Sequence, residues 1–216
     1  MRAWVHGERQ MIVAIEGLDG CGKTTVSRLL AGLLDAVYLK FPDRTTTSGR
    51  VIDKVLRQHG AEWGYAMPPE AFQALQVVNR VEKLQLLEAA RSHPHRHCVC
   101  DRYTASGLVY GLQDGLKRFD LETWNDGLPD PDISVLLVVD PVCIDGERLK
   151  GRDREVYEAR GLQGLEDQAA RFEALWAEHR GEPRWCQFAG PDRSPEDLAK
   201  AICGLAEELG GVVPHV

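Results

Sequence analysis

The sequence predicts an α/β domain in which a parallel β-sheet is flanked by helices. Short apolar segments with strand character alternate along the chain with longer segments of helical periodicity. The first apolar segment also runs into a glycine-rich loop and then an amphipathic helix, which is a strand–loop–helix unit of such folds. A length of 216 residues suits one domain with one core.

Five apolar segments of strand length are predicted to form the sheet. They are Ile12–Glu16, Ala36–Lys40, Cys98–Asp101, Ser134–Asp140 and Arg184–Phe188. The helices predicted around them are Thr24–Leu34, Gly49–His59, Pro69–Ala90, Glu166–His179 and Pro195–Leu209. In the long central helix, Leu75, Val78 and Leu86 are expected to form the buried stripe. Ser194 is the expected N-cap of the last helix, with Pro195 at its first position.

The chain shows no internal repeat and no linker. Residues 1–10 form a polar lead that we expect to be disordered, and residues 11–216 are expected to form a single domain. A net charge of −7 argues against a surface that wraps nucleic acid. No apolar run is long enough to span a membrane and the start does not resemble a signal peptide, so we expect a cytoplasmic protein.

The segment Gly17–Thr25 reads G-L-D-G-C-G-K-T-T and satisfies the phosphate-loop pattern G-x-x-x-x-G-K-[ST]. Its backbone N–H groups and the start of the next helix are expected to bind the phosphates of a nucleotide. The residues predicted to do so are Gly17, Gly20, Cys21, Gly22, Lys23, Thr24 and Thr25. Lys23 should reach the β- and γ-phosphates, and the Thr24 hydroxyl should bind Mg²⁺. The alternative is a glycine-rich turn before a helix, but strand, loop, Lys-Thr and helix all occur in order.

Four further motifs follow the loop in a fixed order. They are Phe41-Pro-Asp-Arg44, Asn79-Arg80, Asp101-Arg-Tyr103 with Ser106 and Tyr110, and Gly127-Leu-Pro-Asp-Pro-Asp132. With them the chain resembles the thymidylate kinases, a family of P-loop nucleoside-monophosphate kinases, from Ile12 to about Ile202. The resemblance implies the P-loop kinase fold with a five-stranded parallel sheet, a homodimer, and Mg²⁺-dependent transfer of phosphate from ATP to dTMP.

Phosphoryl transfer to a monophosphate needs aligned phosphates and compensating positive charge more than it needs a general base. Arg44 and Arg102 are the candidates to hold the acceptor phosphate, with Phe41 and Pro42 of the first motif beside them. Arg102 follows the carboxyl end of a predicted strand, where α/β sheets bind ligands. By the same geometry Asp101 should hold Mg²⁺ through water, with a structural ion pair as its alternative role.

The resemblance assigns Asp19 to the 3′-hydroxyl of the acceptor sugar. At Gly20, one branch of the family carries an arginine that touches the transferred phosphate, whereas the other branch supplies this charge from a lid. Residues 145–160 are rich in arginine, which predicts such a lid. Arg152 or Arg154 would then be catalytic and Arg148 would contact ATP, whereas the alternative is a solvated run of charges.

Arg80 can only donate hydrogen bonds, so it suits the O4 atom of thymine or uracil and should reject cytosine. One helical turn earlier, where the family has a stacking phenylalanine, this chain has Gln76, with Phe72 a further turn back. Tyr110 and Tyr157 are candidates to stack on the base or face the sugar, or else to be core residues.

The predicted function is therefore ATP-dependent phosphorylation of dTMP to dTDP. Two alternatives stay open at this point. Gln76 could favour another deoxypyrimidine monophosphate, such as 5-hydroxymethyl-dUMP. A P-loop module that senses ATP without turnover is the second alternative, although the chain has no N-K-x-D element of a GTPase switch.

Overall fold

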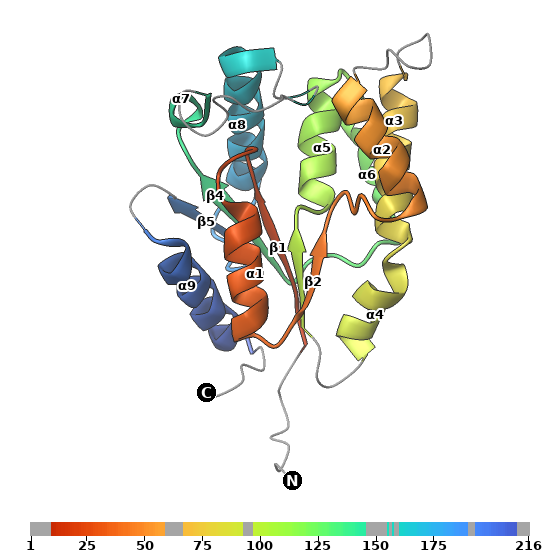
Figure 1. The fold of residues 1–216 in the computed structure, drawn as a ribbon. Helices are drawn as coiled ribbons and strands as arrows, with labels where there is room; N and C mark the ends of the chain where they lie inside the picture. Colours follow the sequence, from red (N-terminus) through yellow and green to blue (C-terminus); the bar gives the residue numbers. More distant parts are fainter. Residues whose placement is uncertain are drawn as a thin grey trace.

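The structure is a computed structural model that describes residues 10–58, 67–92, 97–145, 155, 157, 160–189 and 193–210. Within these ranges the chain forms a parallel sheet of five strands in the order β2-β3-β1-β4-β5 (Figure 1). The strands are β1 (Ile12–Gly17), β2 (Val37–Lys40), β3 (Cys98–Asp101), β4 (Ile133–Val138) and β5 (Trp185–Ala189). The predicted parallel sheet is confirmed, and each strand end lies within two residues of its predicted position.

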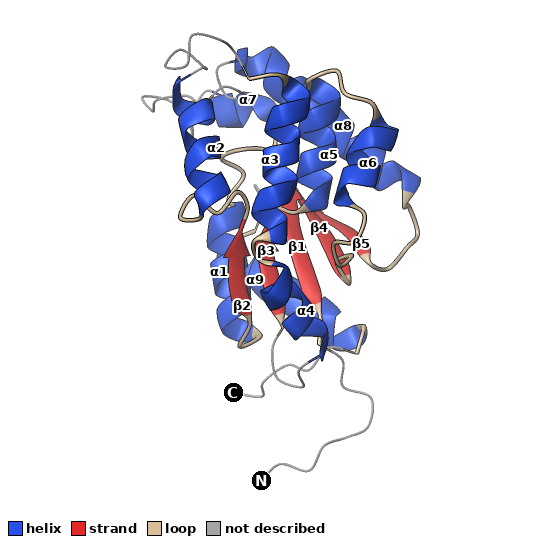
Figure 2. Cartoon of the chain, turned by 90° about the vertical axis from the view of Figure 1, so that its right-hand side faces the viewer, coloured by secondary structure: helices blue, strands red, loops and turns tan. Residues whose placement is uncertain are grey.

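Helices cover both faces of the sheet. They are α1 (Lys23–Leu33), α2 (Thr47–Gln58), α3 (Pro69–Val81), α4 (Leu84–Ser92), α5 (Thr104–Gln113), α6 (Arg118–Asn125), α7 (Pro141–Cys143), α8 (Gly161–Glu178) and α9 (Pro195–Glu208). Helices α1 and α9 pack together on one face, whereas α4, α5 and α8 contact strands from the other (Figures 1 and 2). Across the described ranges, no helix is both long and apolar enough to cross a bilayer.

The prediction of a single long helix over Pro69–Ala90 is wrong. Helix α3 ends at Val81 and α4 begins at Leu84. At the break, the Glu82 carboxylate accepts hydrogen bonds from the Ser48 hydroxyl at 2.7 Å and the Ser48 backbone N–H at 3.3 Å. Glu82 thereby satisfies an N–H group in the first turn of α2, a tertiary contact that a helical period cannot reveal.

The predicted stripe of the long helix is also only partly buried. Val78 is 48% exposed and Leu86 is 39% exposed, whereas Leu75 is half-buried. The buried face of α3 carries Phe72, Gln73, Asn79 and Arg80 instead. A face that buries an amide and a guanidinium is expected where a helix lines a polar site.

Helices α5, α6 and α7 are not predicted by apolar periodicity. Most of α5 is buried, and its buried residues lie around the helix: Ala105, Ser106, Gly107, Val109, Tyr110 and Gly111. No single apolar stripe therefore marks it. At the C-terminus the prediction holds, because the Ser194 hydroxyl accepts from the Asp197 N–H at 3.1 Å and Pro195 opens α9.

Strand β1 is buried over its whole length, because helices cover both of its faces. Val13 and Ile15 belong to a core with α1, whereas Ile12 and Ala14 belong to a second core that includes Leu87 of α4. This central strand places its carboxyl end beside the ends of β3 and β4. The loops after β1, β2 and β3 consequently meet at one edge of the sheet, where α/β folds bind ligands.

Candidate active site

A cavity of about 330 Å³ opens at this edge of the sheet. The predicted site residues that line it are Asp19, Gly20, Gly22, Lys23, Thr24, Thr25, Phe41, Pro42, Arg44, Gln76, Arg80, Asp101, Arg102, Ser106, Tyr110 and Tyr157. Its lining also includes Lys40, Leu56, Gln73, Gly107 and Glu155, which the sequence did not single out. Residues that are widely separated in the chain thus form one polar pocket.

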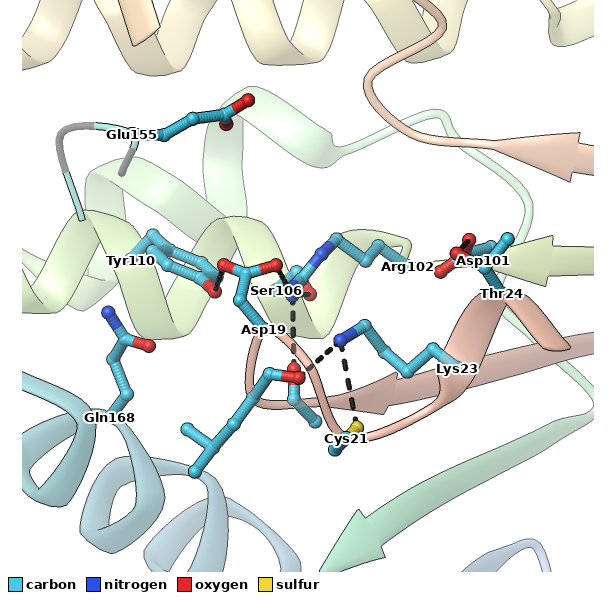
Figure 3. A network of polar contacts seen from close by, with 12 residues as sticks. Asp19, Cys21, Lys23, Thr24, Asp101, Arg102, Ser106, Tyr110, Glu155 and Gln168 are labelled. Carbon is cyan, nitrogen blue, oxygen red and sulfur yellow. Dashed lines mark hydrogen bonds and ion pairs between the residues drawn. The ribbon is translucent and has the colours of Figure 1, made fainter. Parts of the chain in front are cut away.

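The phosphate loop begins at Gly17, where glycine is required. Its φ is +139°, and a Cβ atom at this position would lie 2.6 Å from the backbone oxygen of Leu137 in the adjacent strand. The loop ends at Gly22, the N-cap of α1, with a φ of 100°. Lys23 is buried, and its ammonium donates to the Leu18 carbonyl at 2.5 Å and lies 3.7 Å from the Cys21 sulfur (Figure 3). The loop therefore holds a positive charge at a helix N-terminus.

Thr24 and Asp101 meet at the entrance to the loop. The Thr24 hydroxyl donates to Asp101 Oδ2 at 2.6 Å, and the Tyr38 hydroxyl donates to the same oxygen at 3.1 Å. The Lys40 ammonium lies 2.9 Å from Thr24 Oγ1 and 3.3 Å from Asp101 Oδ2. Burial alone would raise the pKa of Asp101, but Lys23, the Thr24 hydroxyl and Lys40 lower it overall, so the carboxylate stays ionised.

This pair of oxygens fits a magnesium ion. A cationic ammonium already sits on both atoms, and hydroxyl and carboxylate oxygens are ligands that this ion accepts. The described residues contain no group of three or more His, Cys, Asp or Glu side chains arranged to hold a metal ion. The two oxygens of Thr24 and Asp101 suit a cation that keeps most of its water, as Mg²⁺ does.

Arg102 has left-handed backbone geometry, with a φ of 68°, at the end of β3. Its guanidinium donates through Nη1 to the Gly17 carbonyl at 3.1 Å and the Ser106 hydroxyl at 3.0 Å, and through Nη2 to Asp19 at 2.5 Å (Figure 3). The other Asp19 oxygen accepts from the Tyr110 hydroxyl at 3.0 Å. Although burial opposes ionisation of Asp19, Arg102 and Lys23 lower its pKa below the usual range. An unusual backbone conformation thus aims Arg102 across the phosphate loop.

Arg44 also lines the cavity. Its Nη1 donates to Asp53 at 2.7 Å and its Nη2 to Glu155 at 2.5 Å. The loop that carries Arg44 is held by Asn79, whose side-chain oxygen accepts from the Asp43 N–H at 2.7 Å. In the Asn79-Arg80 pair, therefore, the asparagine shapes the Arg44 loop while the arginine faces the cavity.

Arg80 is buried, and burial lowers its pKa to about 10, so it stays charged at neutral pH. Its Nη1 donates to Asn125 at 3.1 Å and its Nη2 to the Tyr103 carbonyl at 3.1 Å. Gly107 makes room for this guanidinium, because a Cβ atom there would lie 2.6 Å from Nη2. Gln73 and Gln76 line the same cavity, so α3 presents two amides in the turns that precede the arginine.

The aromatic wall of the cavity is formed by Tyr110 and Tyr157, whose ring centroids are 4.5 Å apart. Phe72 is buried behind this wall, 6.4 Å from the Tyr157 ring. Phe72 packs with Tyr157 in one apolar cluster and is not among the residues that line the cavity. Its predicted contact with the base therefore stays a prediction. Gly17 and Cys21 also lie in the loop without lining the cavity.

Comparisons with known proteins give a consistent result. A family model described as thymidylate kinase matches residues 15–185. The thymidylate kinase of Schizosaccharomyces pombe is 32% identical over 206 residues, which is 93% of each chain. The chain belongs to the thymidylate kinase family. A probable thymidylate kinase of Methanococcus maripaludis strain C7 is 33% identical over 151 residues, which is 70% of this chain and 71% of the relative.

Solved structures of thymidylate kinases share the fold. The enzyme from Candida albicans aligns with a TM-score of 0.76 at 22% identity and covers 96% of both chains. The enzyme from Ehrlichia chaffeensis aligns with a TM-score of 0.67 at 17% identity and covers 92% of this chain and 99% of that one. This thymidylate kinase family member therefore has the P-loop kinase fold that its motifs predict.

Three predicted site residues of this family member, Arg148, Arg152 and Arg154, lie outside the described residues, as does most of the predicted lid. Some cavity residues were not predicted from the sequence. Of these, Lys40 could have been predicted, because it is a cation at the carboxyl end of a predicted strand, where α/β sheets bind ligands. Gln73 could have been predicted as well, because it lies on the same helical face as Gln76 and Arg80. Glu155 could not, as it is one acidic residue in a charged run.

Proposed function

We propose that the protein transfers the γ-phosphoryl group of ATP to the 5′-phosphate of dTMP and releases dTDP and ADP. The observation that carries this proposal is one cavity in which the phosphate loop, the two arginines Arg44 and Arg102 and the buried guanidinium of Arg80 meet. Membership of the thymidylate kinase family supports dTMP as the acceptor over a 5-modified dUMP. It also disfavours a non-catalytic ATP sensor.

Arginines and Lys23 supply the charge that the reaction requires. The acceptor phosphate carries its own nucleophilic oxygen at neutral pH, because its second pKa is about 6. Arg44 and Arg102, which both line the cavity, would hold this phosphate and release their carboxylate partners as they do so. Lys23 would bind the phosphates of ATP from the loop. Positioning and neutralised charge then account for the catalysis.

Thr24 is proposed to ligate Mg²⁺ directly and Asp101 to hold it through water. When bound, the ion neutralises charge on the β- and γ-phosphates. Lys40 would have to leave the two oxygens, and its exposed side chain allows this movement. No general base is needed for the acceptor.

The base and the sugar would be read by different groups. Arg80 can only donate, so it would face O4 of thymine and leave the amine of cytosine unmatched. Asp19 is proposed to accept from the 3′-hydroxyl, and Tyr110 is proposed to crowd the position of a 2′-hydroxyl. Selection of a deoxypyrimidine would follow from these contacts.

Residues 145–160 are proposed to act as a lid that brings Arg152 or Arg154 to the transferred phosphate. Support comes from the loop, since Gly20 supplies no side-chain charge. Support also comes from Glu155 and Tyr157, two residues of this segment that line the cavity. Closing the segment over the phosphates would exclude water.

The protein is also proposed to be a homodimer. Val78 is 48% exposed and Val81 is 49% exposed on α3, and Phe119 is 75% exposed on α6, which contacts α3 (Figure 2). Large apolar side chains left exposed on adjacent helices are typical of a protein–protein interface. Light scattering should give twice the chain mass for the wild type, and Val81→Asp should give a single chain mass.

A panel of acceptors tests the proposed reaction. ADP release is measured with ATP, Mg²⁺ and one of dTMP, dUMP, dCMP or 5-hydroxymethyl-dUMP, and without an acceptor. We expect the highest kcat/KM with dTMP and the lowest with dCMP. ADP release that is the same with and without every monophosphate would contradict the proposal.

A further inference from the structure

Glu16 is a fully buried carboxylate near the end of β1, and the reaction as described does not use it. It does not line the phosphate cavity but lies behind Ser106, which does. One carboxylate oxygen accepts from the backbone N–H of Tyr103 at 2.8 Å and of Ser106 at 3.3 Å. The other accepts a short hydrogen bond from the Ser106 hydroxyl. A buried carboxylate bound by several donors is held in a fixed position.

The two backbone contacts place Glu16 at the N-terminus of α5. Tyr103 is the N-cap of this helix, and its own side chain makes no capping hydrogen bond. The Glu16 carboxylate of β1 therefore accepts from the N–H groups of the N-cap and of the first turn of α5, where the helix dipole also favours a negative charge. Tyr103 directly follows Arg102, which has the left-handed φ of 68°. Holding Tyr103 thus fixes the backbone on one side of this unusual conformation.

The side-chain contact extends to the guanidinium. Ser106 Oγ gives its single hydrogen to Glu16, so its lone pairs are free to accept from Arg102 Nη1 at 3.0 Å. That bond helps to direct Nη2 of the same guanidinium toward Asp19. Because Glu16 accepts the Ser106 hydrogen, it determines that Ser106 Oγ acts as an acceptor for Arg102 and so helps to orient the guanidinium.

We propose that Glu16 is a positioning residue for phosphoryl transfer, which holds Arg102 on the acceptor phosphate through the Ser106 hydroxyl and the first turn of α5. This inference rests on the proposed function, because the aim of Arg102 matters only if that side chain binds the acceptor. The competing role is structural, in which Glu16 caps α5 and stabilises the fold without affecting catalysis.

The test compares Glu16→Gln, Ser106→Ala and the double variant. In Glu16→Gln the amide oxygen can still accept from the backbone N–H groups of Tyr103 and Ser106, which leaves the NH₂ group facing the Ser106 hydroxyl. This NH₂ group donates to Ser106 Oγ, so the Ser106 hydrogen turns toward Arg102, which is itself a donor. We expect each single variant to lower kcat/KM for dTMP at least tenfold while KM for ATP changes less than twofold. The double variant should lose little more than either single variant, because both act on Arg102.

Asp132→Asn is the matched control. Asp132 is a buried carboxylate that accepts from the Ile12 N–H at 2.9 Å, at the other end of β1. This variant should lower the melting temperature and keep kcat/KM of the folded protein. If Glu16→Gln behaves like this control, the positioning role is overturned. If Glu16→Gln does not fold, a fully active Ser106→Ala overturns it equally.

The wild type separates this inference from the proposed function. If wild-type protein makes no dTDP from dTMP and ATP, the proposed function fails. If the wild type makes dTDP and both single variants match it, the positioning role alone fails.

Discussion

The Lys40 ammonium lies 2.9 Å from the Thr24 hydroxyl oxygen, so a cation from the protein occupies the position proposed for magnesium. Lys40 and Mg²⁺ should therefore compete. Lys40→Met is expected to lower the Mg²⁺ concentration for half-maximal activity by about threefold to tenfold, since removing a charge at close range favours another cation. Mn²⁺ binding with ADP, followed by electron paramagnetic resonance, measures the same effect without turnover. Lys54→Met, on α2, is the charge-matched control, and equal metal affinity in all three proteins would rule the competition out.

The lid prediction concerns residues outside the described ranges. Because the phosphate loop has glycine at position 20, the positive charge on the transferred group should come from Arg152 or Arg154. One of the two alanine variants is expected to lower kcat by about 10²-fold or more, with a smaller rise in KM for dTMP. Steady-state kinetics should find Lys150→Ala unchanged. Near-normal kcat in both arginine variants and in their double variant would exclude the lid arginines.

Gln76 tests how the base is held. It lines the cavity beside Gln73 and Arg80, where the family has a stacking ring. Gln76→Phe is expected to raise kcat/KM for dTMP by about tenfold, because stacking on a base contributes about 1–3 kcal/mol. It should also reduce any preference for 5-hydroxymethyl-dUMP, which a polar amide would satisfy. Gln76→Leu separates stacking from apolar contact and should bring little gain. Arg80→Ala should impair both acceptors alike, and a loss of dTMP use in Gln76→Phe would make Gln76 a direct thymine contact or a packing residue.

Asp19 predicts a pH dependence of stability. Arg102 and Lys23 hold the pKa of Asp19 below its unfolded value of about 3.9. A carboxyl group whose pKa is lower in the folded than in the unfolded state stabilises the protein fully at pH values above the unfolded pKa. This stabilisation is lost as the pH falls from the unfolded pKa through the folded pKa. Asp19→Asn should therefore cost about 1 kcal/mol at pH 7, a modest figure because the Asp19 side chain is 35% exposed. Urea unfolding should show this difference shrinking below about pH 4, whereas a difference that stays constant down to pH 3 would assign the effect to packing.

Features set by local chemistry were predictable from the sequence. The phosphate loop was found because its glycines, Lys23 and Thr24 occur at fixed spacing between a strand and a helix. The sheet was found because buried strands such as β1 and β4 are continuous apolar runs. Arg102 was found because it follows a strand, although the left-handed backbone that aims it was not apparent.

Features set by contacts between distant residues were not predictable. The helix break after Val81 depends on Glu82 binding Ser48, which is 34 positions away. The hydrogen bond from the Ser106 hydroxyl to the Glu16 carboxylate joins residues that are 90 positions apart. Lys40 was a cation at a strand end, but its contact with Thr24 depends on the strand order, in which β3 alone separates β2 from β1 and its phosphate loop. In each case the polar partner, not the local propensity, decides the outcome.

The central claim is tested most directly by identifying the product. The wild-type protein is incubated with ATP, dTMP and Mg²⁺, and phosphorus NMR follows the phosphate signals. We expect dTDP and ADP to appear in equal amounts. Lys23→Ala, which removes the buried ammonium of the loop, should slow this at least about 10²-fold while the variant still folds, as a cooperative melting transition would show. ADP with inorganic phosphate and no dTDP, or a Lys23→Ala protein as fast as the wild type, would contradict the account.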